Sequence, residues 1–482
     1  MIALIKKIIA FLAGPSEGKS SVSSPGTGLE RKIMDFWTAD DRGNKIAIPW
    51  TLRDALPGVF IFGKPGSGKT SGPGRTIAQA LLKEGMGGVV LCAKTSEADE
   101  WTGWANEAGR GGDVVRVTAD GVHRFNVLDY ENKQSGASTI SIVAMLMLLS
   151  EPTRGADRKE DEWHGMCVTL LTNAIDLIRL AGETIKLETI LLLIQDPKAW
   201  RPLEELASVR ELTESQRKDL AICAHYWGDE WETMPEKIKA SIKATLNPIL
   251  SPLSRGDLRE LFSTNTTITP EATFDGTIII IDLPEKSHDI GGKLAAVFWK
   301  LAWQRAVLRR GNAGEEKPTF MWADEFQNFA TSKDAKFCLE SRSAGGISVM
   351  LTQAIPGLWS AMGGRDKGQA AADLLFGSCS TKIFCQNDDR ETNKYAKELI
   401  GRRLQMRENQ STNYNFNQGS GGGGGGRGAS EQMDFIIEDN YFLSLACGGP
   451  KNNSVVTALL YTGNVLAPNS EMFTLTAFKQ KN

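Results

Sequence analysis

Residues 63–70 read GKPGSGKT and fit the pattern G-x-x-x-x-G-K-[ST], a loop whose backbone N–H groups can surround phosphate oxygens. In such a loop the lysine, here Lys69, reaches the β- and γ-phosphates, and the hydroxyl of Thr70 holds Mg²⁺. An apolar run at 58–62 precedes the loop and a helical pattern at 77–82 follows it, as the motif requires, whereas a plain glycine-rich turn is the alternative. The sequence therefore predicts a site for ATP and Mg²⁺ with these binding residues: Gly63, Lys64, Pro65, Gly66, Ser67, Gly68, Lys69, Thr70 and Ser71.

The helix after this loop contains the sequence GPG at 72–74. Pro73 lies four residues after Lys69, so its ring would press on the Lys69 carbonyl if the helix were continuous. We therefore expect about one helical turn, then a kink and a restart near Arg75. The small residues at the kink would let another backbone approach closely, from the same chain or from a neighbouring subunit.

A second motif, PTFMWADEFQNF at 318–329, has mostly apolar strand residues that end in an acidic pair. Ligands of parallel sheets bind at the carboxyl ends of the strands, where this pair would lie. There Asp324 would bind Mg²⁺, directly or through water, and Glu325 would polarise the water that attacks the γ-phosphate. Alone, such a motif is also typical of an acidic turn in solvent, but together with the loop it indicates nucleotide hydrolysis.

The segment SRSAGGISVMLTQA at 341–354 supplies two further candidates for the reaction. Gln353 ends the next predicted strand, where its side chain would sense the γ-phosphate. Arg342 lies on the segment that leads into that strand. In ring ATPases an arginine of this kind can reach the nucleotide of the neighbouring subunit, and such arginine fingers raise turnover by ~10³–10⁵. An ordinary surface arginine explains the position equally well.

The composition is that of an ordinary globular protein. The chain has 482 residues, enough for two or three domains, with 41% hydrophobic and 23% charged residues. Its net charge of −3 excludes a globally basic surface, so any contact with nucleic acid must be local, such as a lined channel. The seven cysteines and four histidines are scattered, which indicates buried thiols in a reducing compartment and neither a zinc site nor a disulfide framework.

The elements that must position these residues form an α/β fold. Strand-like runs alternate with helical patterns, which is typical of a mostly parallel sheet covered by helices. Between 138 and 255 the pattern is entirely helical, and we interpret this stretch as an all-α domain that projects from one edge of the nucleotide-binding domain. The nucleotide-binding domain is thereby split into 31–137 and 256–482. The strand-like runs lie at 58–62, 87–94, 113–117, 123–129, 276–284, 319–325, 346–354 and 380–387.

The N-terminal sequence is distinct from this core. Residues 1–14 predict an amphipathic helix roughly 20 Å long, too short to cross a bilayer, which would anchor at a membrane surface or dock on a partner protein. Residues 15–30 are rich in Ser, Gly and Pro and predict a flexible linker. The sequence contains no run of eighteen apolar residues, so no transmembrane helix is predicted.

A glycine run lies within residues 408–432 and predicts a flexible loop without regular structure. Two interpretations remain open for it. The loop is either a disordered surface segment or a contact for single-stranded DNA inside a ring, made by Tyr414, Phe416 and Arg427.

The motifs together resemble those of the type IV secretion coupling proteins, the conjugative DNA-transfer ATPases of the TraG/TraD type. The sequences RFNVLD at 124–129 and TKIFCQNDDRETNKYAKELIG at 381–401 add to the resemblance, which covers roughly residues 45–470. The chain departs from the family in two places. It has only the short amphipathic start where relatives begin with transmembrane helices, and CAKTSE at 92–97 replaces an Asp-Pro-Lys-Gly-Glu sequence, which leaves the role of Lys94 open.

The resemblance implies a RecA-like P-loop ATPase that forms a homohexameric ring, hydrolyses ATP when bound to DNA, and passes a DNA–relaxase substrate to a secretion channel. It implies the roles given above for each site residue, with Arg342 as the finger in trans and Gln353 as the sensor. We expect a cytoplasmic protein. A further expectation is that residues 1–13 contact the inner membrane peripherally.

Two other functions fit the same residues. One is a soluble duplex-DNA pump similar to FtsK and HerA that serves packaging, repair or defence. The other is a non-motor adaptor whose nucleotide orders the helical domain for a protein partner. Glu325 argues against the adaptor, because a simple switch needs no water-activating carboxylate. The sequence leaves open the type of DNA strand, the direction of transport and the identity of the relaxase.

Overall fold

The computed structural model describes residues 28–39, 44–151, 163–196, 198–312, 317–414, 423–463 and 472–480. The predicted N-terminal helix and most of the predicted linker fall on residues 1–27, outside the described part, and Gly28–Glu30 form a short 3₁₀ helix. No helix within the described residues is long and apolar enough to span a bilayer.

The centre of the fold is a nine-stranded sheet with the strand order β13-β12-β9-β3-β8-β7-β4-β6-β5. The strands from β9 to β5 are parallel, whereas β12 and β13 are antiparallel and close one edge. The predicted α/β fold with a mostly parallel sheet is therefore confirmed. The strands are β3 (Val59–Phe62), β4 (Gly88–Leu91), β5 (Val114–Val117), β6 (Ile278–Ile281), β7 (Thr319–Ala323), β8 (Gly346–Thr352), β9 (Thr381–Phe384), β12 (Val455–Thr462) and β13 (Phe473–Lys479).

Helices cover both faces of this sheet, and each face has its own hydrophobic core. Successive strand residues point to opposite faces, so Val89 of β4 packs into one core and Val90 into the other. On one face lie α3 (Arg75–Lys83) and α4 (Glu97–Glu107), with Trp101 stacked on Phe320. The opposite face is covered mainly by α13 (Glu285–Arg309), α14 (Asp334–Glu340), α15 (Ile355–Ala361) and α16 (Gly364–Ser378).

A small second sheet extends the antiparallel edge. Its strands, β1 (Lys32–Ala39) and β2 (Lys45–Thr51), are joined to the short helix α2 (Leu52–Ala55). The Thr38 hydroxyl donates to the Leu475 carbonyl at 2.7 Å, and Phe36 packs edge-on against Phe478. The N-terminal strands are thereby fastened to β13, the last strand of the chain.

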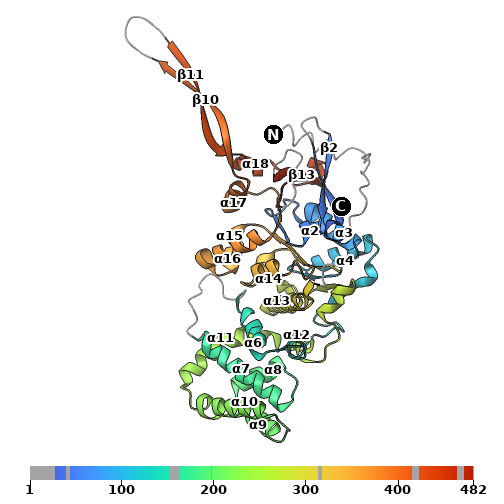
Figure 1. Cartoon of the computed structure of the whole chain (residues 1–482), viewed down its shortest axis with the longest axis vertical. Coiled ribbons are helices and arrows are strands. Elements are labelled where there is room, and N and C mark those ends of the chain that lie inside the picture. Colours follow the sequence, from blue (N-terminus) through green and yellow to red (C-terminus); the bar gives the residue numbers. More distant parts are fainter. Residues whose placement is uncertain are drawn as a thin grey trace.

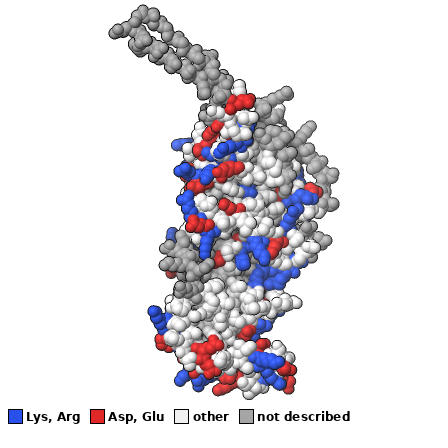
Figure 2. All heavy atoms as spheres, turned by 60° about the vertical axis from the view of Figure 1, so that its left-hand side comes forward, with Lys and Arg blue, Asp and Glu red and all other residues white. Residues whose placement is uncertain are grey.

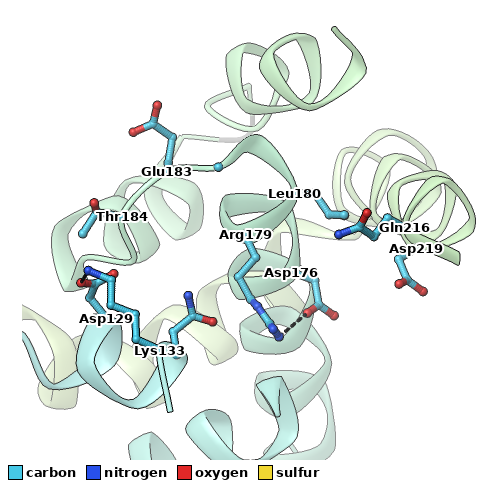
Figure 3. A pocket seen from close by; sticks show the side chains of 11 residues that line it. Asp129, Lys133, Asp176, Arg179, Leu180, Glu183, Thr184, Gln216 and Asp219 are labelled. Carbon is cyan, nitrogen blue, oxygen red and sulfur yellow. Dashed lines mark ion pairs between the residues drawn. The ribbon is translucent and has the colours of Figure 1, made fainter. Parts of the chain in front are cut away.

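The part of the chain from Thr139 to Ser263 contains only helices among its described residues, and it lies at one end of the molecule, in green in Figure 1. A polar pocket of about 480 Å³ opens on this region (Figure 3), lined by residues that include Asp176, Arg179 and Glu183. The helices are α6 (Thr139–Leu148), α7 (His164–Ala181), α8 (Leu187–Gln195), α9 (Arg201–Ser208), α10 (Glu214–His225), α11 (Glu236–Leu253) and α12 (Gly256–Ser263), with a π-helical turn at Tyr226–Trp231.

One predicted strand is a helix. The apolar run at 123–129 leads into α5 (Val127–Asn132), because the Asn126 side chain accepts a hydrogen bond from the Asp129 amide and caps the helix. An apolar run this short fits a strand or a buried helix, and the asparagine at the cap position decides the outcome.

The flexible loop predicted over 408–432 is also corrected. Its described residues belong to a long two-stranded ribbon of β10 (Arg402–Tyr414) and β11 (Gly423–Phe435), which projects from the body in Figure 1. The glycines are tolerated because the ladder uses backbone groups only, and Tyr414 pairs with Gly423. Two helices flank the ribbon, α17 (Arg390–Ile400) and α18 (Asp439–Ser444). Of the suggested DNA contacts, Tyr414 and Arg427 lie on its strands and Phe416 lies outside the described residues.

Charges of both signs are mixed over the face shown in Figure 2, with basic and acidic side chains next to one another along the body. This agrees with a net charge of only −3. A basic surface suited to nucleic acid does not stand out on this face of the described residues, so recognition of a polyanion by overall attraction is not indicated there.

Candidate nucleotide-binding site

The loop after β3 has the shape that its sequence predicts. Gly66 and Gly68 have φ values of 74° and 82°, in the left-handed region where a residue without Cβ is favoured. Alternation of such residues with right-handed ones turns successive N–H groups toward one point, which makes a concavity for an anion. A Cβ at Gly63 would collide with Ser67 Oγ, so the loop is closed tightly on itself.

The helix that follows changes type around Pro73, and its α-helical part α3 begins at Arg75 as predicted, with Gly74 in a helical conformation between the two parts. Thr70–Gly74 form a π-helical turn that continues directly into α3. The Gly74 N–H donates to the Lys69 carbonyl at 2.9 Å, five residues back, and this wider turn accommodates the ring of Pro73. The close neighbour expected at this point belongs to the same chain, because a Cβ at Gly72 would lie 2.9 Å from the Cβ of Val456 on β12.

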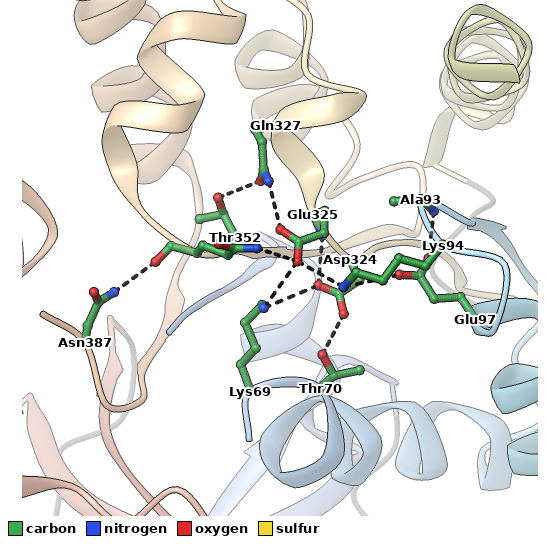
Figure 4. A network of polar contacts seen from close by, with 11 residues as sticks. Lys69, Thr70, Ala93, Lys94, Glu97, Asp324, Glu325, Gln327, Thr352 and Asn387 are labelled. Carbon is green, nitrogen blue, oxygen red and sulfur yellow. Dashed lines mark hydrogen bonds and ion pairs between the residues drawn. The ribbon is translucent and has the colours of Figure 1, made fainter. Parts of the chain in front are cut away.

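The acidic pair lies directly opposite the loop, at the carboxyl end of β7 (Figure 4). The Thr70 hydroxyl donates to Asp324 Oδ2 at 2.6 Å. Lys69 Nζ lies 4.0 Å from Asp324 Oδ1 and 3.5 Å from Glu325 Oε1. The side chains of Lys69, Asp324 and Glu325 are each less than a tenth exposed. Two motifs from distant parts of the sequence therefore meet at one edge of the sheet.

Glu325 is held by donors from several elements. Its Oε1 accepts from Gln353 at 2.9 Å and its Oε2 from Gln327 at 2.8 Å, while Lys94 Nζ lies 3.0 Å from Oε1 (Figure 4). Burial by itself would raise the pKa of Glu325, but the hydrogen bond from Gln353, the charge of Lys69 and the bonds from Gln327 and Lys94 outweigh burial and hold the pKa at about 2. The side chain is therefore a carboxylate.

The backbone of Glu325 also has an unusual conformation. Its φ of 51° and ψ of 47° lie in the left-handed region, which is strained for a residue with a side chain. Such strain persists only where surrounding contacts fix it. The four side chains named above bond to this carboxylate or pair with it, and they come from several elements at this edge of the sheet. Together they fix its position.

Sequence reasoning missed Gln327 and Thr352 in this network and left the role of a third contributor, Lys94, open. Gln327 lies two residues beyond the acidic pair, and the hydroxyl of Thr352 donates to Gln327 Oε1 at 2.8 Å. Lys94 follows β4, a strand whose position beside β7 cannot be read from the sequence. For Lys94 the available signal was its place at the end of a predicted parallel strand, where ligands of such sheets bind. For Gln327 the signal was a polar side chain only two residues after the acidic pair.

Arg342 is not part of this site. It lies on the turn before β8, at the amino end of that strand, and it is exposed. Gln353 follows the other end of the same strand. A seven-residue strand is roughly 20 Å long. Arg342 therefore lies at the edge formed by the amino ends of the strands, whereas the acidic pair of its own chain lies at the edge formed by the carboxyl ends.

The residues present fit a triphosphate with its metal. Ser67 Oγ is buried in the loop without a hydrogen-bond partner, an orphaned polar atom that a phosphate oxygen would satisfy. Thr70 and Asp324 offer the hard oxygen ligands that Mg²⁺ prefers. Within the described residues no three His, Cys, Asp or Glu side chains form a metal site by themselves. A Mg²⁺ ion that also takes oxygens from phosphate and water suits such a sparse protein donor set.

Comparison with known proteins agrees with this picture. A profile of the family described as "Type IV secretory system Conjugative DNA transfer" matches residues 30–422. No curated protein matches the sequence. Among solved structures, the unbound form of the bacterial conjugative coupling protein TrwBdeltaN70 is similar at 14% identity, with a TM-score of 0.60 over 96% of this chain and 97% of that chain.

Two nucleotide complexes of the plasmid coupling protein TrwB are similar to the same extent. The complex with ADP and Mg²⁺ has 13% identity, a TM-score of 0.61 and coverage of 95% of this chain and 96% of that chain. The complex with the non-hydrolysable ATP analogue ADPNP has 12% identity, a TM-score of 0.60 and the same coverage. At such identities the likeness shows a shared fold, and it confirms the predicted RecA-like P-loop architecture.

Proposed function

The chain belongs to the type IV secretory system conjugative DNA transfer family, and on this premise we propose that it is an ATP-hydrolysing DNA translocase. The observation that carries the proposal is the meeting of Lys69 with Asp324 and Glu325 at one edge of the sheet, 4.0 Å and 3.5 Å apart. A hydrolysing P-loop enzyme needs both halves of this arrangement.

In this proposal the loop binds the phosphates of ATP and the Lys69 ammonium neutralises their charge. Thr70 and Asp324, already in contact, would hold Mg²⁺, which supplies charge neutralisation at the phosphates when it is bound. The TrwB complexes with ADPNP and with ADP and Mg²⁺ support this choice of ligands. Because Lys69 lies 3.5 Å or more from its two carboxylate partners, its ammonium is available to bind the phosphates.

Glu325 would orient and polarise the attacking water. A carboxylate offers about four lone-pair sites, and its two glutamine donors leave capacity for a water once Lys69 turns to the phosphates. Gln353 would act as the sensor, because its side chain contacts Glu325 and its carbonyl accepts from Asn387 Nδ2 at 3.0 Å. A change at the γ-phosphate is thereby passed to the segment after β9.

We further propose a homohexameric ring in which Arg342 serves a neighbouring subunit. Arg342 is exposed, and it lies at the amino ends of the strands, away from the acidic pair of its own chain. Both features support a role in trans. In that case, subunits with Arg342→Ala mixed into wild type reduce activity by more than their fraction. A strictly proportional decline would place Arg342 outside any neighbour's site.

The substrate in this proposal is DNA, passed on with its relaxase to the secretion channel, and the family membership supports DNA as the partner. We propose a cytoplasmic ring whose residues 1–13 contact the inner membrane or a protein of the channel. Flotation with liposomes, with and without these residues, distinguishes the two contacts.

The test is the rate of ATP hydrolysis by the full chain with Mg²⁺, measured without DNA, with single-stranded DNA and with duplex DNA, next to its mass in solution. We expect DNA to stimulate the rate and the active species to have the mass of a ring. A hydrolysis rate that is the same without DNA, with single-stranded DNA and with duplex DNA would contradict a DNA motor and favour the adaptor. Stimulation by duplex alone would favour a pump similar to FtsK and HerA.

A further inference from the structure

A second lysine reaches the acidic pair from a strand that carries none of the recognised motifs. Lys94 lies shortly after the end of β4, next to β7 in the sheet. Its Nζ is 3.0 Å from Glu325 Oε1, closer than Lys69 at 3.5 Å (Figure 4). The Lys94 side chain is 53% exposed, whereas that of Lys69 is 7% exposed.

Lys94 also lies near a third carboxylate, that of Glu97 at the start of α4. The distance from Lys94 Nζ to Glu97 Oε1 is 3.9 Å. Glu97 Oε2 accepts from the Ala93 N–H at 2.7 Å, and Oε1 is buried without a hydrogen-bond partner. Burial, with the charge of Asp324, raises the pKa of Glu97 to about 8, so at neutral pH it is mostly uncharged. The charged partner of Lys94 is therefore Glu325.

The contacts of Lys94 point to a task within the site. Its ion pair is with Glu325, and its other carboxyl neighbour is Glu97, both at the edge that faces the loop. An exposed lysine paired in this way adds little to the stability of the fold. It does fix the direction of a carboxylate whose own backbone is strained, with φ at 51°.

We propose that Lys94 is a positioning residue for hydrolysis, which holds the Glu325 carboxylate in place when Lys69 turns to the phosphates. The inference rests on the proposed ATPase activity. In the structure two ammonium groups share Glu325 Oε1. A bound triphosphate competes for Lys69, and Lys94 then remains as the cation that keeps the carboxylate facing the water.

The experiment compares Lys94→Met with Lys94→Arg in the full chain. We expect Lys94→Met to lower kcat by about 10- to 100-fold, the scale of a misplaced reacting group. The KM for ATP, the affinity for a fluorescent ATP analogue with Mg²⁺, and the Tm should stay near wild type, because the Lys94 side chain is half exposed and pairs with Glu325 and not with a residue of the loop. Lys94→Arg should recover most of kcat, since it keeps the charge.

A matched control is Lys317→Met, which removes an exposed lysine paired with Asp275 at 2.9 Å, remote from the site. It should leave every parameter unchanged. Wild-type kcat in Lys94→Met, equal losses in both Lys94 variants, or a loss of analogue affinity would overturn the role of Lys94 alone. Absence of turnover in the wild-type chain would overturn the ATPase proposal and this inference with it.

Discussion

Two buried lysine–carboxylate clusters adjoin the segment after β7, and they differ in how completely each lysine is bonded. Lys300 on α13 is fully buried and donates to both Asp334 oxygens at 2.6 Å, to the Phe329 carbonyl at 2.7 Å and to Thr331 Oγ1 at 3.2 Å. Lys69 has carboxylates only at 3.5 Å and 4.0 Å.

Their carboxylates differ in the same way. Asp334 also accepts from the Thr331 N–H at 2.6 Å and from Gln304 at 2.8 Å, which closes the cluster without outside help. The Lys69 cluster lies at the open edge of the sheet next to the unpartnered Ser67 hydroxyl. Buried charges are tolerated when they are fully paired. The difference teaches that one cluster holds the fold together and the other is left incomplete for an anionic ligand.

The largest effect on stability is expected from Lys300→Met, which leaves Asp334 buried without its cation. Breaking a buried pair in this way costs about 3–5 kcal/mol, so the free energy of unfolding in urea should fall by that amount. The kcat of the protein that remains folded should not change. A loss below about 1 kcal/mol, the scale of an exposed pair such as Lys317–Asp275, would remove the structural side of the comparison.

Lys69→Ala should do the reverse. Turnover should fall at least about 100-fold, because a charge that stabilises the transition state is lost. Stability should change less than in Lys300→Met, since Glu325 keeps Lys94 and Asp324 keeps Thr70. The measurements are steady-state hydrolysis and urea unfolding. A variant that unfolds as readily as Lys300→Met would show that both lysines are structural.

Ligand binding sharpens the contrast. A non-hydrolysable ATP analogue with Mg²⁺, present at 100 times its Kd, should stabilise the wild-type chain by about 2.7 kcal/mol. Lys300→Met should gain the same increment from its lower baseline, and Lys69→Ala should gain little, as thermal unfolding with and without the analogue would show. Equal gains in all three proteins would place the ligand elsewhere.

The smallest effect is expected where neither cluster is touched. The ribbon β10–β11 can be excised by joining Gly401 to Ile436, whose N–H already donates to the Gly401 carbonyl at 3.2 Å. This variant should keep its unfolding free energy and its hydrolysis rate without DNA, because the ribbon projects from the body. Loss of hydrolysis without DNA would mean that the ribbon supports the site.

The sequence was sufficient for residues whose chemistry is tied to a local pattern. Lys69 and Thr70 follow from the loop, and Asp324, Glu325 and Gln353 follow from strand ends, because the carboxyl ends of parallel strands meet at one edge. The structure brings these five side chains together. The sheet was equally predictable, since strands buried on both faces are continuous apolar runs.

The rest depended on partners far along the chain. Lys94 meets Glu325 only because β4 lies beside β7, and the pairing of Lys300 with Asp334 depends on how α13 packs. The π-helical turn at Pro73 is closed by two backbone hydrogen bonds, from Gly74 N–H to Lys69 and from Arg75 N–H to Thr70, and Pro73 indicated that the helix would be irregular without indicating this type of turn. The strands of the ribbon pair through backbone groups, which every residue type has. The glycine run was therefore interpreted as a loop although it forms part of a strand. The role of Arg342 in trans stays a prediction, because the strand β8 separates it from Gln353 of its own chain.

The central claim is that ATP is split between Lys69 and the acidic pair, and Glu325→Gln tests it most directly. The amide keeps the size of the side chain but cannot polarise water as a carboxylate does. Single-turnover hydrolysis should fall by about 10²–10⁴, while binding of ATP with Mg²⁺ stays within a few-fold of wild type. Hydrolysis at the wild-type rate in this variant would contradict the account.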